Sequence, residues 1–159
     1  MYKIKWKPLI VCLAIPLLGG LAVGLITMKD TSAFASVAQP PLSPPGWLFP
    51  VVWTILYALM GIASYLVYTA DAPYEKKLNA LLAYAGQLFF NLLWSIWFFS
   101  VRQYTFAFGW LVILFALIWL TFALFRSVNR TAARLLIPYI LWVAFAGYLN
   151  LGVAILNPA

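Results

Sequence analysis

Five long apolar runs make up most of the chain and constrain its fold more than any other feature. They cover residues 8–28, 47–70, 78–101, 104–125 and 132–156 of a 159-residue sequence. Each reaches about the 20 residues that a helix needs to cross the hydrocarbon of a bilayer. Inside lipid every backbone polar group must be paired within the chain, so each run is predicted to be a helix. The sequence therefore predicts an all-α fold: a single membrane domain built as a five-transmembrane-helix bundle.

Composition supports this prediction. Hydrophobic residues make up 66% of the chain and charged residues 8%, whereas a soluble domain is about half apolar and about one quarter charged. The net charge is +7, which on a soluble protein would suggest nucleic-acid binding. Here the basic residues fall in the N-terminus and in short connectors, so orientation in the membrane explains them and no nucleic-acid partner is expected.

The chain has no histidine and a single cysteine, Cys12, inside an apolar run. The lack of histidine excludes histidine-ligated haem, most catalytic zinc sites and Ser–His or Cys–His nucleophile pairs. The three acids, Asp30, Asp71 and Glu75, all lie in connectors. No carboxylate is therefore available inside a span for proton-coupled transport or paired-carboxylate catalysis. We expect no catalytic residue, no metal site and no cofactor, and binding is favoured over enzymatic activity.

The first run has a competing interpretation as a secretory signal peptide. Three lysines precede it, and residues 33–35 (AFA) resemble a cleavage site. Signal peptides have an apolar region of about 7–15 residues, which this run exceeds, and Lys29 and Asp30 interrupt the approach to the site. The length favours a retained membrane helix. The connector that follows, residues 29–46, contains four prolines and Gly46, so it is predicted to be a long, stiffened loop of the kind that often carries function.

Lysine and arginine are distributed unevenly between the two sides. With five spans, the N-terminus, residues 71–77 and residues 126–134 share one side, which holds eight of the basic residues. The other side holds only Lys29 and Arg102. Because basic residues accumulate in cytoplasmic loops, the N-terminus is predicted to be cytoplasmic and the C-terminus outside. The proline-rich loop would then lie on the outer side.

Neutral polar and aromatic side chains form stripes on three of the predicted helices, since residues four apart share a helix face. The stripes are Gln87, Asn91, Trp94, Ser95 and Phe98 on the third run, Phe49, Trp53, Tyr57 and Gly61 on the second, and Pro138, Trp142, Ala146 and Asn150 on the fifth.

These stripes have two interpretations. The first is a flat, mostly apolar pocket with a few hydrogen-bonding groups, suited to a planar hydrophobic ligand. The second is helix packing, in which the amides bond across helices. Spacing alone favours packing. Gly20 and Gly24 form a G-x-x-x-G pair on the first run, which permits close helix approach within the bundle or between two copies of the chain.

Three segments in order resemble the translocator protein family, also called tryptophan-rich sensory proteins or peripheral benzodiazepine receptors. They are residues 44–57 (PPGWLFPVVWTILY), residues 87–94 (QLFFNLLW) followed by Phe98 and Phe99, and residues 132–139 (AARLLIPY) followed by Trp142, Phe145, Leu149 and Asn150. The resemblance extends from about residue 40 to 151 and includes the five spans.

The resemblance implies a five-helix bundle, commonly a homodimer, with a pocket beneath the long first loop. Family members bind porphyrins and other tetrapyrroles, cholesterol in animals, and synthetic benzodiazepine-type ligands. Carried over by position, the implied ligand-binding residues are Pro44, Trp53, Tyr57, Asn91, Trp94, Ser95, Trp142 and Ala146. Animal members place a basic residue soon after a tyrosine on the fifth helix, and none follows Tyr148 here. This departure counts against cholesterol as the native ligand.

The resemblance thus favours a receptor or sensor that binds a tetrapyrrole such as protoporphyrin IX, with membrane lipid around it. Two alternatives stay open. One is light- and oxygen-dependent porphyrin degradation, which some family members are reported to promote. The other is passive transport of porphyrin or lipid across the membrane. The short basic N-terminus and the charge asymmetry suit a bacterial plasma membrane.

Overall fold

The structure is a computed structural model of the chain and describes residues 4–34 and 36–158. Its helices are α1 (Trp6–Phe34), α2 (Leu48–Tyr68), α3 (Tyr74–Ser95), α4 (Tyr104–Val128), α5 (Arg130–Leu135) and α6 (Ile137–Leu156), and a π-helical turn, η1 (Ile96–Ser100), continues α3. Within these residues five helical stretches are long and apolar enough to cross a membrane, α5 and α6 together forming the last. The prediction of an all-α, five-span membrane fold is confirmed.

The first helix is longer than predicted. It continues to Phe34, so the connector to α2 is shorter than the predicted loop 29–46. A helix of 29 residues is roughly 43 Å long and exceeds the hydrocarbon thickness, so its last turns can carry polar residues. Asp30 is one of these polar residues. Its carboxylate accepts a 2.6 Å hydrogen bond from the Ser100 hydroxyl and so connects the end of α1 to η1.

The last span is bent rather than continuous. It begins at Arg130, two residues before the predicted start, and α5 ends at Leu135. The Asn129 side chain caps α5 by accepting hydrogen bonds from the backbone N–H groups of Thr131 and Ala132. The bend coincides with Pro138 in the first turn of α6, where proline lacks an N–H donor for the preceding turn.

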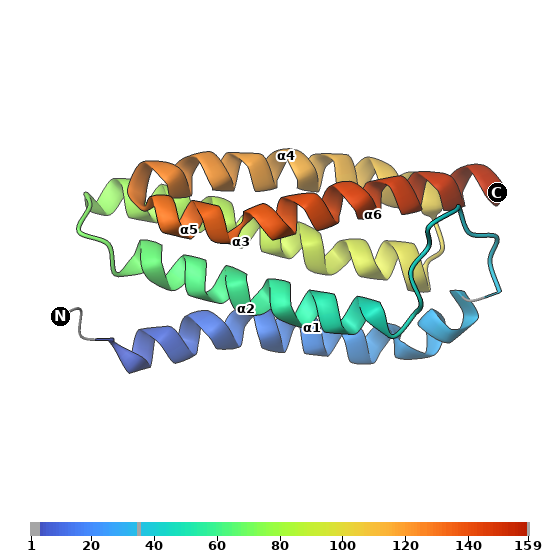
Figure 1. Cartoon of the computed structure of the whole chain (residues 1–159), viewed down its shortest axis with the longest axis horizontal. Helices are drawn as coiled ribbons and strands as arrows, with labels where there is room; N and C mark the ends of the chain where they lie inside the picture. The colour runs from blue at the N-terminus through green and yellow to red at the C-terminus, as the bar shows by residue number, and fades with distance from the viewer. Residues whose placement is uncertain (1–3, 35, 159) are drawn as a thin grey trace.

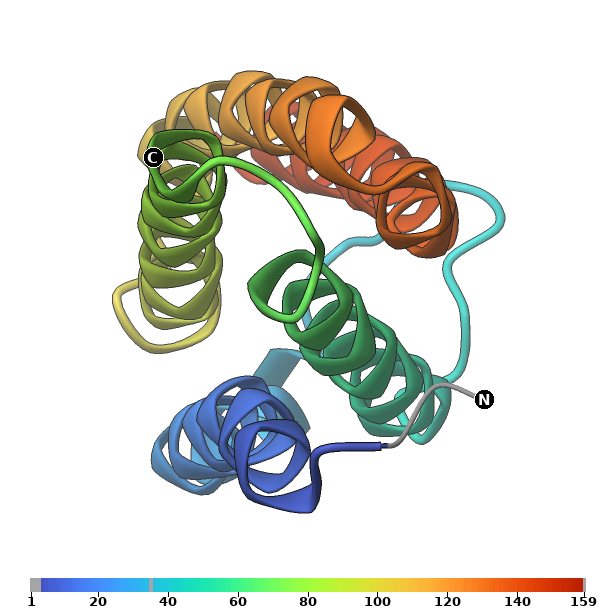
Figure 2. The ribbon, with the colours of Figure 1, turned by 90° about the vertical axis from the view of Figure 1, so that its left-hand side faces the viewer.

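The helices form a bundle in which each element packs on particular neighbours. The most extensive contacts are those of α1 with α2, α3 with α4, and α4 with α6. Figure 2, viewed along the bundle, shows α1 at one corner beside α2, with α3, α4 and the α5–α6 span completing the ring. The N-terminus and the connectors α2–α3 and α4–α5 lie at one end, and the 36–47 loop and the C-terminus lie at the other (Figure 1).

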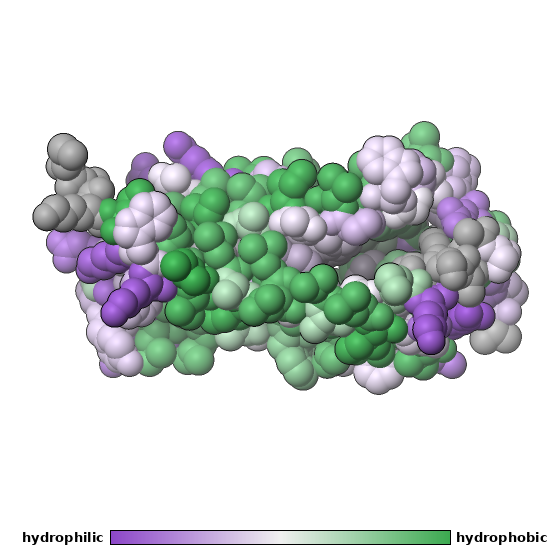
Figure 3. Space-filling model, turned by 90° about the horizontal axis from the view of Figure 1, so that it is seen from below, coloured by the Kyte–Doolittle hydropathy of each residue, from purple (hydrophilic) through white to green (hydrophobic). Residues whose placement is uncertain are grey.

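The surface matches a bilayer. Figure 3 shows an apolar band across the middle of one face, with hydrophilic residues gathered at the two ends. The long exposed apolar side chains of α1, such as Leu18, Leu21 and Leu25, are about 60% exposed. Such exposure would be costly in water and costs nothing against lipid tails. The chain is a multi-pass membrane protein.

Close contact between α1 and α2 depends on glycine. A Cβ atom at Gly61 would lie 2.8 Å from the carbonyl oxygen of Cys12 and 2.9 Å from the Cα of Leu13, so only glycine admits the α1 backbone at this distance. Gly20 likewise faces the ring of Tyr57. Gly24, its partner in the G-x-x-x-G pair, meets nothing within 4 Å. Only one glycine of that pair therefore packs inside the bundle.

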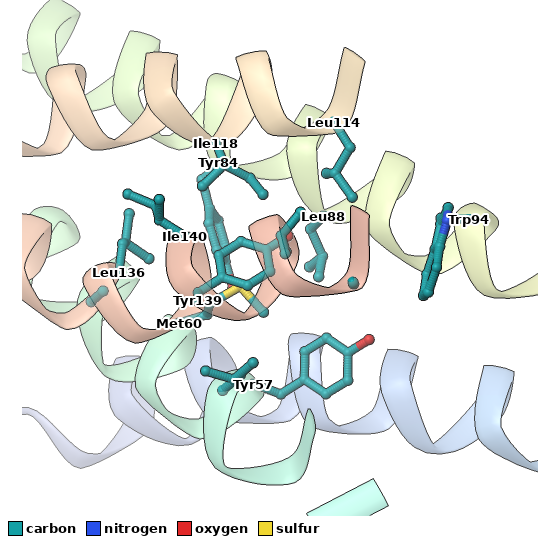
Figure 4. Packing of buried hydrophobic residues seen from close by; sticks show 14 of the residues in the cluster. Tyr57, Met60, Tyr84, Leu88, Trp94, Leu114, Ile118, Leu136, Tyr139 and Ile140 are labelled. Carbon is teal, nitrogen blue, oxygen red and sulfur yellow. The ribbon is translucent and has the colours of Figure 1, made fainter. Parts of the chain in front are cut away.

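A chain of buried hydrogen bonds joins α2, α3 and α6. The Tyr57 hydroxyl donates to Asn91 Oδ1 at 2.8 Å, and Asn91 Nδ2 donates to the Tyr139 hydroxyl at 3.0 Å. The Tyr139 hydroxyl in turn donates to Gln87 Oε1 at 2.7 Å. Asn91, Tyr139 and Gln87 are almost completely buried. Figure 4 shows Tyr57 and Tyr139 in the core between their helices. We call these four residues the polar network.

Substituting Gly61 tests the α1–α2 contact. Gly61→Ala places a methyl group against the backbone of α1 and forces the helices apart, so we expect a loss of about 1–3 kcal/mol in the free energy of unfolding. Unfolding in mixed detergent micelles measures it. Gly86→Ala on α3 is the matched control, because a Cβ there meets no atom within 4 Å. Equal stability of the two variants would contradict the proposed contact.

Removing one hydroxyl tests the polar network. Tyr139→Phe leaves the Gln87 carbonyl oxygen without its donor and the Asn91 amide without its acceptor. We expect a loss of about 1–2 kcal/mol in the free energy of unfolding. Tyr74→Phe serves as the control, since Tyr74 is 71% exposed. A Tyr139→Phe protein as stable as this control would show that the network contributes nothing to stability.

Candidate functional site

Aromatic side chains from α2, α3, η1 and α6 meet beneath the 36–47 loop. Trp53 lies at the centre: its ring centroid is 5.5 Å from that of Tyr57, 6.5 Å from Trp94 and 6.2 Å from Tyr139. Trp94 stacks on Phe98 at 5.2 Å. We call the following set the aromatic cluster: Phe49, Trp53, Tyr57, Trp94, Phe98, Tyr139 and Trp142.

Aromatic side chains also bridge α2 and α6. Phe49 of α2 meets Trp142 of α6 edge to face, with centroids 5.9 Å apart and an interplanar angle of 68°. Trp53 and Tyr139 form a second edge-to-face pair across the same gap, at 67°. Few backbone contacts join the two helices, which lie further apart than α1 and α2. Rings rather than backbone therefore fill this side of the bundle.

Most polar atoms of the site already have partners. Asn91 uses its oxygen for Tyr57 and its nitrogen for Tyr139. The Trp94 indole N–H donates to Asn150 Oδ1 at 3.0 Å. The Trp142 indole N–H is different, because it is buried and has no hydrogen-bond partner. A buried donor in lipid normally finds an acceptor. The Trp142 N–H is therefore the polar group of the cluster that can bond an incoming ligand without losing an existing hydrogen bond.

A small cavity separates the cluster from the loop. Its volume is about 20 Å³, which is room for a single water-sized molecule. Pockets that hold drug-sized ligands have volumes of about 300–1,000 Å³. The site is therefore closed, and its own side chains occupy the space. The lining residues are Gln39, Ser43, Phe49, Trp94, Phe98, Ala146, Leu149 and Val153.

The loop over the cavity is attached to α6. Ala38 exchanges two hydrogen bonds with the side chain of Asn157, with its N–H donating at 3.2 Å and its carbonyl accepting at 2.8 Å. The Tyr148 hydroxyl donates to the Pro41 carbonyl at 2.8 Å. Pro40 packs so closely on Gly152 that a Cβ there would lie 2.6 Å from the proline ring. Opening the cavity at this end requires these contacts to loosen.

The structure brings six of the eight predicted binding residues together: Trp53, Tyr57, Asn91, Trp94, Trp142 and Ala146. Of the eight, only Trp94 and Ala146 line the cavity itself, and Pro44 in the loop and Ser95 on α3 are half buried. No ligand contact tests any of the eight, so their role in binding stays a prediction.

The predicted set omits Tyr139, which belongs to both the polar network and the aromatic cluster. The stripe on the fifth run assumed a strict spacing of four, which drifts by about 40° per step on a helix of 3.6 residues per turn. The buried face of α6 instead follows alternating steps of four and three, through Tyr139, Val143, Ala146, Asn150 and Val153. Alternating spacing would have found Tyr139. The loop residues Gln39 and Ser43 carry no comparable periodic signal.

The cluster can hold a flat apolar ligand by stacking and can offer it one indole N–H. None of its residues is a carboxylic acid, a histidine, a lysine or an arginine.

Comparison with known proteins agrees with this description. The sequence model of the TspO/MBR family matches residues 12–156. The chain is 36% identical over 151 residues to the tryptophan-rich protein TspO of Chlorobaculum tepidum, which covers 94% of this chain and 96% of that protein. It is 36% identical over 147 residues to the translocator protein of Ovis aries, covering 91% and 87%. A tryptophan-rich sensory protein of Cereibacter sphaeroides is 32% identical over 130 residues, covering 82% and 80%. The chain belongs to the TspO/MBR family.

Proposed function

We propose that this protein is a membrane receptor or sensor for a planar hydrophobic ligand, a tetrapyrrole such as protoporphyrin IX, held in the aromatic cluster. The central position of Trp53 carries the proposal, because its ring touches partners from α2, α3 and α6 and offers a face for stacking. One relative is named a sensory protein, which fits a sensing role.

Binding requires the site to open. A tetrapyrrole is far larger than the 20 Å³ cavity, so it must displace rings of the cluster and loosen the loop. The edge-to-face pair of Phe49 and Trp142 is suited to such movement, since side-chain rotations cost less than separating packed backbones. The free protein would thus be closed, and ligand would stabilise an open form.

The polar anchor of the ligand is expected at Trp142 rather than at Asn91. Both ends of the Asn91 amide are already bonded, and a ligand that took one of them would break the polar network. The Trp142 N–H has no partner to lose. A tetrapyrrole carboxylate or ring nitrogen could accept its hydrogen bond without such a cost.

Conservative tryptophan substitutions test the site. We expect Trp53→Phe and Trp142→Phe each to raise the protoporphyrin IX dissociation constant about twofold to tenfold, because the smaller ring stacks over less area and, at position 142, also lacks the indole N–H. Absorbance titration of the porphyrin in detergent measures it. Trp119→Phe is the matched control, since Trp119 is 48% exposed on α4 and outside the cluster. Unchanged tight binding in both cluster variants would overturn this placement.

We also propose that the protein lies in the plasma membrane with its N-terminus in the cytoplasm and its C-terminus outside. The N-terminal end of the bundle carries Lys5, Lys7, Lys76, Lys77, Arg126, Arg130 and Arg134, whereas Lys29 and Arg102 belong to the other end. Lys3 lies outside the described residues. This asymmetry supports the orientation, and it would place the loop and the cavity at the outer surface.

Cysteine labelling tests the orientation. In a Cys12→Ser background, Ala38→Cys lies in the exposed loop and Ser127→Cys lies at the exposed end of α4. We expect a membrane-impermeant maleimide added to intact cells to label the first and not the second. Permeabilised cells, in which both should react, provide the control. The opposite pattern would reverse the proposed topology.

A further inference from the structure

A second and much larger recess lies between α1, α2 and α3, away from the aromatic cluster. Its volume is about 700 Å³. It runs between Lys7–Ile15 of α1 and Leu81–Leu92 of α3, and Ser64 and Tyr68 of α2 also line it. We call it the α1–α3 groove. Figure 2 shows that the α1 and α3 ribbons stand apart at the end that faces the viewer, where α1 begins.

The groove exists because α1 follows α2 rather than α3. Because Gly61 has no side chain, α1 packs closely on α2 at Cys12 and Leu13. Contact with α3 is close further along, where a Cβ on Gly19 would lie 3.0 Å from the side chain of Leu92. Towards the N-terminal end the two helices diverge. Val11, Ile15 and Leu88 are among the apolar residues that line the opening.

One deep polar atom of the groove lacks a partner. Tyr84 is 6% exposed, and its hydroxyl is buried without a hydrogen bond. Its ring packs against Phe125, with centroids 5.9 Å apart. The Ser64 hydroxyl is close enough to interact weakly with the Tyr84 hydroxyl but donates its own hydrogen bond to the Gly61 carbonyl at 2.9 Å. Because unpaired buried polar groups are rare and costly in lipid, the Tyr84 hydroxyl indicates an occupant with a hydrogen-bonding group at this depth.

The polar end of the groove is cationic. Lys7 is exposed and lines the groove where α1 begins. The α3 wall, from Leu81 to Leu92, spans about 16 Å at 1.5 Å per residue. This is close to half the hydrocarbon thickness of about 30 Å, the depth of one leaflet. Cys12 lies five residues beyond Lys7, about 7.5 Å deeper, and it lines the groove together with Tyr84.

We propose that the α1–α3 groove is a binding site for one anionic glycerophospholipid of the adjoining leaflet. Its phosphate pairs with Lys7, an ester carbonyl just below accepts a hydrogen bond from the Tyr84 hydroxyl, and an acyl chain follows the apolar walls. A lysine at the membrane surface attracts anionic headgroups, and the carbonyl supplies the acceptor that Tyr84 lacks. This site is separate from the aromatic cluster and does not rest on the proposed tetrapyrrole function.

Native mass spectrometry of the detergent-purified full chain, titrated with defined lipids, tests the proposal. We expect phosphatidylglycerol to bind about threefold to tenfold more tightly than phosphatidylcholine of the same chains. Lys7→Gln should remove that preference, whereas Lys76→Gln, an exposed lysine at the same end that does not line the groove, should keep it. Ala85→Trp should fill the groove and abolish the binding of both lipids, since Ala85 lines it.

An ether-linked phosphatidylglycerol isolates the role of Tyr84. This lipid has no ester carbonyl, so it should bind the unaltered protein about twofold to tenfold more weakly than the ester lipid. Tyr84→Phe should bind both equally, and Tyr74→Phe should behave like the unaltered protein. Because each comparison is made within one variant, a change in stability alone does not produce it.

Three results would overturn the proposal. They are equal affinity for ester and ether lipids in the unaltered protein, a lipid preference that survives Lys7→Gln, and a dimer that Ala85→Trp disrupts with no lipid bound, which would show a second copy in the groove. Protoporphyrin titration of Tyr84→Phe should match the unaltered protein. The lipid measurements therefore test the α1–α3 groove alone, and the porphyrin measurements test the aromatic cluster alone.

Discussion

The need to pair every buried polar group without water governs this protein. Hydrocarbon offers no hydrogen bonds, so the amides and hydroxyls of the core must bind one another. Tyr57, Asn91, Tyr139 and Gln87 do so in a continuous chain across α2, α3 and α6. A packed apolar interface tolerates some sliding of helices, but these bonds hold only in one arrangement. The network therefore specifies the register of the three helices that build the aromatic cluster.

The exceptions to this pairing are as informative as the network. Among the described residues, three buried polar atoms have no partner, and they belong to Tyr84, Trp97 and Trp142. Trp142 belongs to the closed aromatic cluster, and Tyr84 lines the open groove beside α1. The two recesses are opposite in character: one is filled by its own rings, and the other is an open groove between α1 and α3. Each offers an incoming molecule a single unsatisfied donor.

The candidate site could be predicted only in part. Trp53, Tyr57, Asn91 and Trp94 come together because they share helix faces, and face sharing can be read from spacing. Spacing alone favoured helix packing over a ligand pocket, and only the family resemblance favoured the pocket. Tyr139 was missed because a strict spacing of four drifts around the helix. Only Trp94 and Ala146 of the predicted residues line the cavity, because the path of the loop and the rotation of the helices depend on contacts distant in sequence.

The sequence by itself determined the number of spans, the helical fold, the collection of basic residues at one end and the lack of carboxylates and histidine in the aromatic cluster. These properties follow from the length and composition of local segments, because each segment must by itself be long and apolar enough to cross the bilayer as a helix. Only the tertiary structure decided that the pocket is closed, that Asn91 is already engaged and that α1 leaves a groove along α3. Such outcomes depend on how side chains from different helices fill shared space, and no single segment contains that information.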